Sequence, residues 1–180
     1  KSVLNDGTLR FNGSVFFIDI SGLQTTIFDP SIANLFFSDN AADAEITGLE
    51  GDFLYYPNIE GLILSGAFSV LDTEIKKSLT TNDVLAGQEL AFAPGVQANL
   101  MARYEWGLTA GNQGHVQAQV NWSDDSFSDI IEPNKARQDS YSFMNIRAGI
   151  SNDEWTTEIY VDNVTDERAE ISNNFVYDRQ

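Results

Sequence analysis

Hydrophobic and polar residues alternate over two neighbouring stretches in the middle of the chain, 96–106 and 115–122. Because successive side chains of a β-strand point to opposite faces, each stretch predicts a strand with one apolar and one polar face. Residues 107–114 between them predict a tight turn. The apolar positions are small or aliphatic in mid-strand and aromatic toward the ends, as is typical of a strand between lipid and a water-filled barrel interior.

The same alternation, weaker in places, predicts about eight strands in all. The other six lie at 1–4, 9–17, 46–56, 62–70, 144–150 and 155–162. Short turns are expected at 5–7, 57–61, 107–114 and 151–154, and long polar connections at 29–43, 72–94 and 123–139. Short and long connections therefore alternate, which would place all short turns at one rim of an up-and-down meander, as in outer-membrane barrels. A soluble Greek-key sandwich need not keep that rhythm.

Trp and Tyr residues give a second indication, because both favour the boundary between membrane and water. Five of them fall at strand ends on the apolar face, and we expect these at the membrane interface: Tyr55, Tyr104, Trp106, Trp122 and Trp155. The alternative is that the rings cap a soluble core, which would place aromatic residues in mid-strand at least as often.

Composition limits the possible functions without choosing among them. The 180 residues carry 10 Lys and Arg against 27 Asp and Glu, and the resulting net charge of −17 argues against a nucleic-acid partner. The acidity either serves solubility and salt tolerance or gathers cations. The chain has no Cys and one His, so disulfides and thiolate metal sites are excluded and a His-rich metal or haem site is not expected. No apolar run reaches the ~20 residues of a membrane helix.

Polar residues of the predicted strands are the candidates for function, and we find no catalytic, metal or cofactor motif among them. We expect one set to face a barrel lumen: Glu50, Asp52, Gln97, Asn99, Arg103, Glu105, Gln117, Gln119, Asn121 and Arg147. Each of these either contacts a transported ligand or other protein segments, or simply hydrates the wall.

Two other groups admit a functional reading beside a plainer one. His115, next to a short turn, is either a solvated or structural residue or a ligand. Asp124, Asp125, Asp129 and Glu132 are either solvated loop acids or oxygen ligands of a cation. Their spacing matches no specific calcium loop.

Four segments carry a resemblance to one family. Residues 40–50 (NAADAEITGLE), 62–72 (LILSGAFSVLD), 87–94 (GQELAFAP) and 155–167 (WTTEIYVDNVTDE) resemble, in order and spacing, four strand motifs of TonB-dependent outer-membrane receptors. Together they cover much of the chain. The resemblance implies an all-β fold, an antiparallel up-and-down transmembrane β-barrel, of which residues 1–180 are a C-terminal portion with about eight of 22 strands.

The resemblance also implies partners and a location. In the family an N-terminal plug domain fills the barrel and a TonB box engages the TonB–ExbB–ExbD complex; ligands contact mostly the extracellular loops and the plug apex. Here those loops would be parts of 29–43, 72–94 and 123–139. We find no signal peptide, plug, TonB box or final strand in this chain, so we expect a fragment. The expected partners are outer-membrane lipid, TonB–ExbB–ExbD through the missing plug, and a small nutrient ligand.

The sequence thus predicts part of a receptor in the outer membrane of a Gram-negative bacterium, with no enzymatic activity. Its function would be TonB-energised uptake of a scarce nutrient such as a ferric siderophore, cobalamin or an oligosaccharide. Two alternatives remain at this point: a passive porin-like barrel without a plug, and a soluble all-β module that binds carbohydrate.

Overall fold

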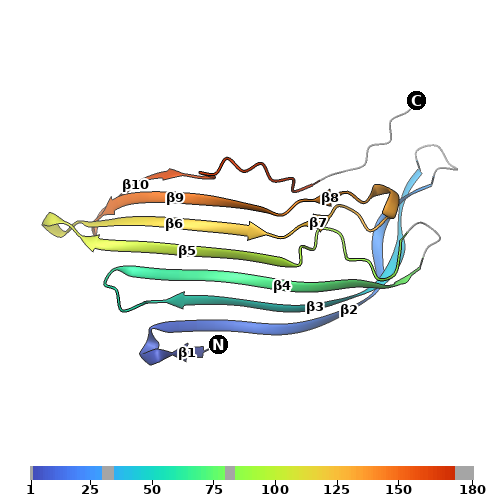
Figure 1. Ribbon diagram of the computed structural model, residues 1–180, viewed down its shortest axis with the longest axis horizontal. Helices are drawn as coiled ribbons and strands as arrows, with labels where there is room; N and C mark the ends of the chain where they lie inside the picture. Colours follow the sequence, from blue (N-terminus) through green and yellow to red (C-terminus); the bar gives the residue numbers. More distant parts are fainter. Residues whose placement is uncertain (1, 30–34, 80–83, 173–180) are drawn as a thin grey trace.

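The structure is a computed structural model that describes residues 2–29, 35–79 and 84–172. The described residues form an antiparallel sheet of eight strands in the order β1-β2-β3-β4-β5-β6-β9-β10 (Figure 1). Two further strands, β7 and β8, form a small hairpin within the connection between β6 and β9. The bounds are β1 Ser2–Leu4, β2 Leu9–Asp29, β3 Leu35–Tyr55, β4 Leu62–Ser78, β5 Val96–Gly107, β6 Gln113–Ser123, β7 Ser126–Phe127, β8 Arg137–Gln138, β9 Tyr141–Ser151 and β10 Thr156–Val161.

The predicted antiparallel meander is confirmed, and so is the placement of the short turns. Figure 1 shows the turns after β1, β3, β5 and β9 at one end of the sheet, and the β4–β5 and β6–β9 connections at the other. The turn after β1 is the 3-10 turn Asn5–Gly7, and the turn after β5 contains Thr109–Gly111. No described helix is long and apolar enough to cross a membrane.

The expected long connection at 29–43 is wrong, because most of it is strand. β2 and β3 stay paired from Leu9 opposite Tyr55 to Asp29 opposite Leu35, with register shifts near Leu23. Gly22 adopts a left-handed backbone (φ 69°) at this irregularity, and its N–H donates to Asp43 Oδ1 at 2.9 Å. A glycine tolerates that conformation without steric cost, so the hairpin can bend there and continue.

The predicted end of the fourth strand near residue 70 is also too early, since β4 runs on to Ser78. Beyond Val70 the alternation of large apolar and polar residues disappears from the sequence, which is why a connection was expected at 72–94. The strand continues because β3 still pairs with it, from Thr47 opposite Asp72 to Ala42 opposite Ser78. The connection itself is residues 79–95, and residues 80–83 of it lie outside the described part.

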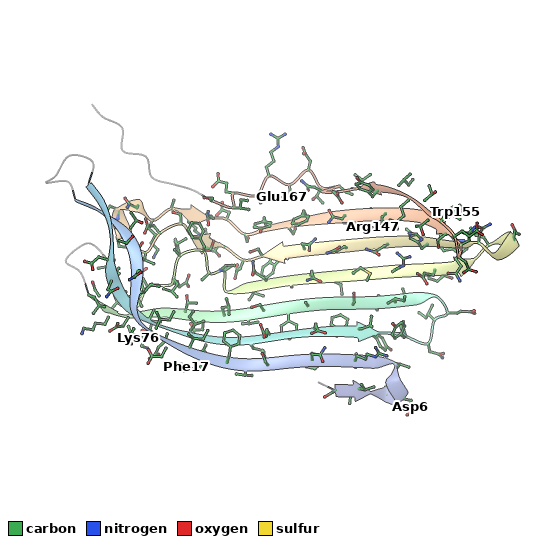
Figure 2. The ribbon with its side chains drawn as sticks, turned by 180° about the vertical axis from the view of Figure 1, so that it is seen from behind. Asp6, Phe17, Lys76, Arg147, Trp155 and Glu167 are labelled. Carbon is green, nitrogen blue, oxygen red and sulfur yellow. The ribbon has the colours of Figure 1, made fainter. Side chains whose placement is uncertain are left out.

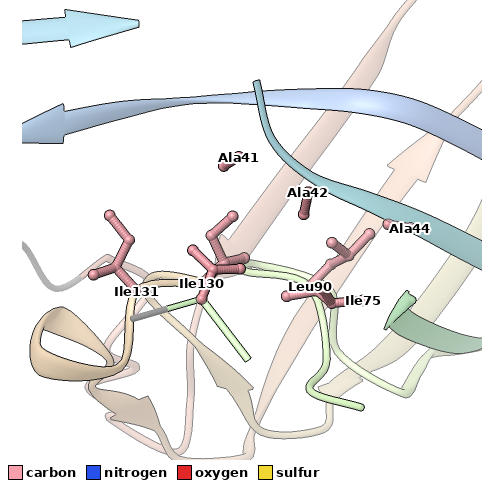
Figure 3. Close-up of a cluster of buried hydrophobic side chains, with 8 residues drawn as sticks. Ala41, Ala42, Ala44, Ile75, Leu90, Ile130 and Ile131 are labelled. Carbon is pink, nitrogen blue, oxygen red and sulfur yellow. The ribbon is translucent and has the colours of Figure 1, made fainter. Parts of the chain in front are cut away.

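A compact apolar cluster holds the two long connections against these strand extensions. We call it the loop-anchoring cluster; its members come from β3, β4 and both connections (Figure 3), and they are Ala41, Ala42, Ala44, Ile75, Val84, Leu90, Ile130 and Ile131. Ile75 is fully buried, and the alanines leave room for the loops to approach the sheet closely. Burying an aliphatic side chain as large as that of Ile75 contributes about 1.5–3 kcal/mol to stability relative to leaving it exposed.

Backbone hydrogen bonds join the loops to β4 and to each other. The N–H of Ile75 donates to the carbonyl of Gln88 and its carbonyl accepts from Gly87, each at 2.8 Å. Phe92 N–H donates to the carbonyl of Phe127, and Val84 forms a β-bridge with Ile131. These bonds satisfy backbone groups of β4 where the strand extends beyond its pairing with β5. Both connections are therefore folded parts of this end of the molecule rather than unstructured polar loops.

Candidate functional site

The register of the sheet sorts its side chains into two faces, because residues directly opposite each other across strands share a face. Between β5 and β6, Leu100 lies opposite Val120 and Ala102 opposite Ala118, while Asn99 lies opposite Asn121. The apolar positions therefore align with apolar positions, and polar with polar. From β2 to β10 the large apolar side chains of the exposed face follow the same register, so that face is continuously apolar. The opposite face is largely polar, with exceptions such as Ile18 opposite Ile46 and Phe143 opposite Asn121.

The apolar face is exposed and has a limited height. Leu100 is 53% exposed, and Ile159 on β10 is 76% exposed. The apolar positions run from Leu9 to Phe17 on β2, nine residues, and from Val96 to Trp106 on β5, eleven residues. Nine to eleven residues is about what a tilted strand needs to cross a bilayer.

Charged side chains mark where the apolar face ends. Beyond Phe17, Leu49 and Val70 the same face carries Glu45 opposite Glu74, and Lys76 forms ion pairs with both, at 3.2 and 2.9 Å. Figure 2 shows Phe17 and Lys76 toward one end of the sheet and Trp155 at the opposite end, beside the short turn after β9. The face is therefore an apolar band with charges above it and aromatic residues below.

The five expected interface aromatics lie close to the ends of strands. Tyr104 and Trp106 stack on each other with ring centroids 5.9 Å apart, and Trp155 lies in the turn before β10. Trp106 also covers Gly114 of the adjacent strand, where an added Cβ would approach the indole to 2.6 Å. Tyr55 and Trp122 lie on the same face by register. That these rings contact a membrane interface stays a prediction.

The ten expected lumen residues all lie on the polar face, in two groups. Five line a hollow of about 660 Å³ on that face, toward the end with the long connections: Glu50, Asp52, Gln97, Asn99 and Asn121. The other five lie nearer the short turns: Arg103, Glu105, Gln117, Gln119 and Arg147. The hollow indicates that the polar face is concave. That this face lines a lumen stays a prediction.

The group near the short turns is tied together by side-chain hydrogen bonds. Arg103 donates to Glu105 at 2.7 Å and to Gln117 at 3.3 Å. Arg147, labelled in Figure 2, lies directly opposite Gln117 on one side and Tyr160 on the other. Two guanidinium groups therefore flank one glutamine in a single row across β5, β6 and β9.

His115 is a structural residue rather than a solvated one, which settles part of what the sequence left open. Its side chain lies over Gly149 of β9, and its Nε2 is 2.7 Å from Oε1 of Glu158 on β10. The residue is 2% exposed. Because Gly149 has no side chain, the imidazole can reach across β9, so His115 and Glu158 tie three strands together near the short turns.

The acidic loop residues take part in the fold of the β6–β9 connection. Asp125 Oδ2 accepts from Arg137 Nε at 2.8 Å, Asp129 Oδ1 accepts from the backbone of Ile131, and Glu132 lies 3.4 Å from Lys135. The hydrogen bond from Arg137 holds the pKa of Asp125 below its ordinary value. Within residues 2–29, 35–79 and 84–172 no group of three His, Cys, Asp or Glu is arranged to hold a metal ion.

Several residues of the hollow and of the loops were not singled out from the sequence. Asn12 and Ser14 of β2 donate to Asp52 and Glu50, each at 2.8 Å, and Tyr141 stacks on Phe143 at the opposite, β9 side of the hollow. The alternation in the sequence is enough to place Asn12 and Ser14 on the polar face of β2. That β9 lines the same hollow follows only from the arrangement of the strands in the folded sheet. The ammonium of Lys135, 4.2 Å from the Phe127 ring centroid, has no sequence signal.

Solved structures of similar fold come from bacterial receptors. The ferric preacinetobactin receptor BauA from Acinetobacter baumannii matches with a TM-score of 0.66 and 22% identity over 91% of this chain and 24% of its own. The siderophore receptor PiuA from the same species matches with 0.70 and 18% over 94% and 24%. The ferripyoverdine receptor of the outer membrane of Pseudomonas aeruginosa matches with 0.63 and 15% over 94% and 23%.

The chain spans about a quarter of the length of these structures, and at such identities the likeness shows the fold alone. A family model described as "TonB dependent receptor-like, beta-barrel" matches residues 1–164, nearly the whole chain. The match agrees with the resemblance seen in the four sequence motifs and with the sheet's single apolar face. The chain belongs to the β-barrel family of TonB-dependent receptors.

Proposed function

We propose that this chain forms part of the barrel wall of an outer-membrane receptor that imports a scarce nutrient in a TonB-dependent step. The observation that carries the proposal is the family match over residues 1–164. The two faces of the sheet support it: an exposed apolar band of transmembrane height, and a concave polar face that would line the interior. The family and its structural neighbours are receptors, not enzymes.

We also propose that the chain is a C-terminal portion of the barrel, and that a plug and a TonB box lie elsewhere in the protein. Its coverage of about a quarter of the similar receptors supports a partial barrel, and the number 22 for the complete strand count stays a prediction. Outer-membrane lipid would contact the apolar face. The TonB–ExbB–ExbD complex would act through the plug, not through this sheet.

The soluble carbohydrate-binding sandwich does not fit the architecture. A sandwich packs two sheets face to face around a common core. In the described part of the chain, the only other sheet is the two-stranded β7–β8 hairpin, and the large side chains of the apolar band stay exposed. A passive porin would share the sheet, so it has to be separated from a receptor by its energy dependence.

Uptake by the full-length receptor in its own host tests the proposal. Periplasmic accumulation of a radiolabelled ferric siderophore, cobalamin and a maltooligosaccharide would be measured with the receptor gene intact or deleted, and with tonB intact or deleted. We expect accumulation of at least one solute to require both genes. Accumulation that requires the receptor gene but not tonB would instead identify a passive barrel.

A further inference from the structure

The β4–β5 and β6–β9 connections contact each other as well as the strands. The backbone N–H of Phe92 in the first connection donates to the carbonyl of Phe127 in the second at 2.8 Å. Val84 of the first pairs with Ile131 of the second in an isolated β-bridge, and both side chains are buried. The two connections therefore share backbone contacts at two separate points.

A buried cation adds a third contact between them. The side chain of Lys135, in the β6–β9 connection, is 9% exposed. Its ammonium group donates to the side-chain carbonyl of Gln88 in the β4–β5 connection. It also lies 3.4 Å from a carboxylate oxygen of Glu132 and 4.2 Å from the centroid of the Phe127 ring. An amide oxygen, a carboxylate and an aromatic face each attract an ammonium group, and one of these three partners belongs to the other connection.

The other cation of the connections has a different setting. The side chain of Arg137 is 60% exposed and forms ion pairs with Asp125 and Asp139, both in its own connection. The β4–β5 connection, residues 79–95, contains no Lys or Arg. Among the described residues, Lys135 is therefore the cation that joins the two connections, whereas Arg137 acts within one of them.

These contacts depend on one another because separation of the connections breaks all of them at once. Lys135 would lose Gln88, and a buried ammonium group that loses a hydrogen-bond partner is costly. Phe92 and Phe127 would lose their backbone hydrogen bond, and the β-bridge of Val84 would open. Segments whose contacts are lost in a single step form a cooperative unit, which opens with one free energy.

We propose that the two connections open and close as a single cooperative unit, with Lys135 as the positioning residue that holds them together. Contact of a solute or partner with one connection then changes the opening equilibrium of the other, and the coupling is the same in both directions. The unit lies at the end of the sheet opposite the short turns (Figure 1). The inference goes beyond the proposed function and does not depend on it, because every contact lies within the described residues.

Hydrogen exchange of the full-length receptor in phosphatidylcholine vesicles tests the unit. Lys135→Met keeps an unbranched side chain and removes the charge. It should lower protection about tenfold or more in both 84–95 and 124–139, because a hydrogen bond from a charged group is lost. Gln88→Met, on the other side of the same contact, should also lower protection in both segments. The decisive readout in each variant is the connection that does not carry the substitution.

Lys77→Met is the matched control, since Lys77 is an exposed lysine of β4 outside both connections; it should leave both segments unchanged. Amides of β5 and β6 check in each variant that the sheet is intact, and Gln88→Met supplies the same test if Lys135→Met disturbs them. A fall in protection confined to the substituted connection, or no fall in either connection, would overturn the cooperative unit.

The uptake experiment keeps this outcome separate from the receptor proposal. If tonB-dependent uptake is found while the two connections respond independently, the cooperative unit is wrong and the receptor function stands. If wild-type cells show no tonB-dependent uptake, the receptor function itself fails, whatever the exchange measurements show.

Discussion

Leu100 offers a direct test of which face of the sheet contacts lipid. It lies near the middle of β5, opposite Gly66 of β4 and Val120 of β6, and its side chain is 53% exposed on the apolar face. An arginine at the bilayer midplane on the lipid face of a barrel costs about 2–4 kcal/mol. At an exposed position in water the same change would be worth only about ±0.5 kcal/mol. The two readings therefore differ by several kcal/mol at one residue.

Met101 is a matched control, since it is the next residue of the same strand and faces the polar side between Ser65 and Gln119. Leu100→Arg should lower the free energy of unfolding by about 2–4 kcal/mol more than Met101→Arg, which is roughly 30- to 900-fold in the unfolding equilibrium. Urea titration of the full-length receptor in phosphatidylcholine vesicles measures both. Equal costs, or a larger cost at Met101, would refute the assignment of the apolar face to lipid.

Three further predictions concern the loops, the strand packing and pH. Ile75→Ala should lower the local free energy of unfolding by about 2–5 kcal/mol and reduce hydrogen-exchange protection in residues 84–95 and 124–139. Ile159→Ala, at an exposed position, should leave the protection of both segments unchanged. Full protection in Ile75→Ala would count against the loop-anchoring cluster. Gly114→Val should lower the free energy of unfolding by about 1–3 kcal/mol and shift the Trp fluorescence, because the added side chain displaces Trp106. Gly107→Val, which has open space at its Cβ, should do neither. Equal effects of the two variants would contradict the packing of Trp106 on Gly114. The folded-state pKa of Asp125 lies below its ordinary 3.8, so its ion pair with Arg137 should stabilise the β6–β9 connection above pH 3.8. This stabilisation should be lost as the pH falls through the lowered pKa. Hydrogen-exchange protection, corrected for the intrinsic rate at each pH, should show the loss in the wild type and not in Asp125→Asn.

Face assignment within the membrane-height band could be predicted from the sequence because it follows from a period of two, and the strand order could be predicted because short and long connections alternate. A slip of one residue between neighbouring strands would turn every apolar side chain of a strand to the polar face and every polar one to the apolar face. The alternating pattern therefore fixes the register. Leu100 with Val120, and Asn99 with Asn121, illustrate this. The short turns could also be predicted from the sequence; Asp6-Gly7, for example, is a strong turn signal.

The strand extensions and the folded loops could not be predicted in this way. Beyond Phe17 and Val70 the outer face carries charges such as Glu45 and Lys76. On β3 the residues that face the loops are alanines, Ala41, Ala42 and Ala44, so from 38 to 45 no large apolar residue marks a strand. Polar, alanine-rich strand and polar loop look alike in one dimension. Pairing with a neighbouring strand, and burial beneath residues 90 and 130–131, decide between them.

The composition of the hollow is likewise a property of the tertiary structure. The sequence placed Glu50, Asp52, Asn99 and Asn121 on polar faces of their strands, each by local alternation alone. That Tyr141 and Phe143, some 90 residues after Glu50, lie in the same concavity depends on the register and the curvature of the folded sheet. Alternation fixes which side of the sheet a residue faces, whereas only the register and curvature of the folded sheet fix which residues line one hollow.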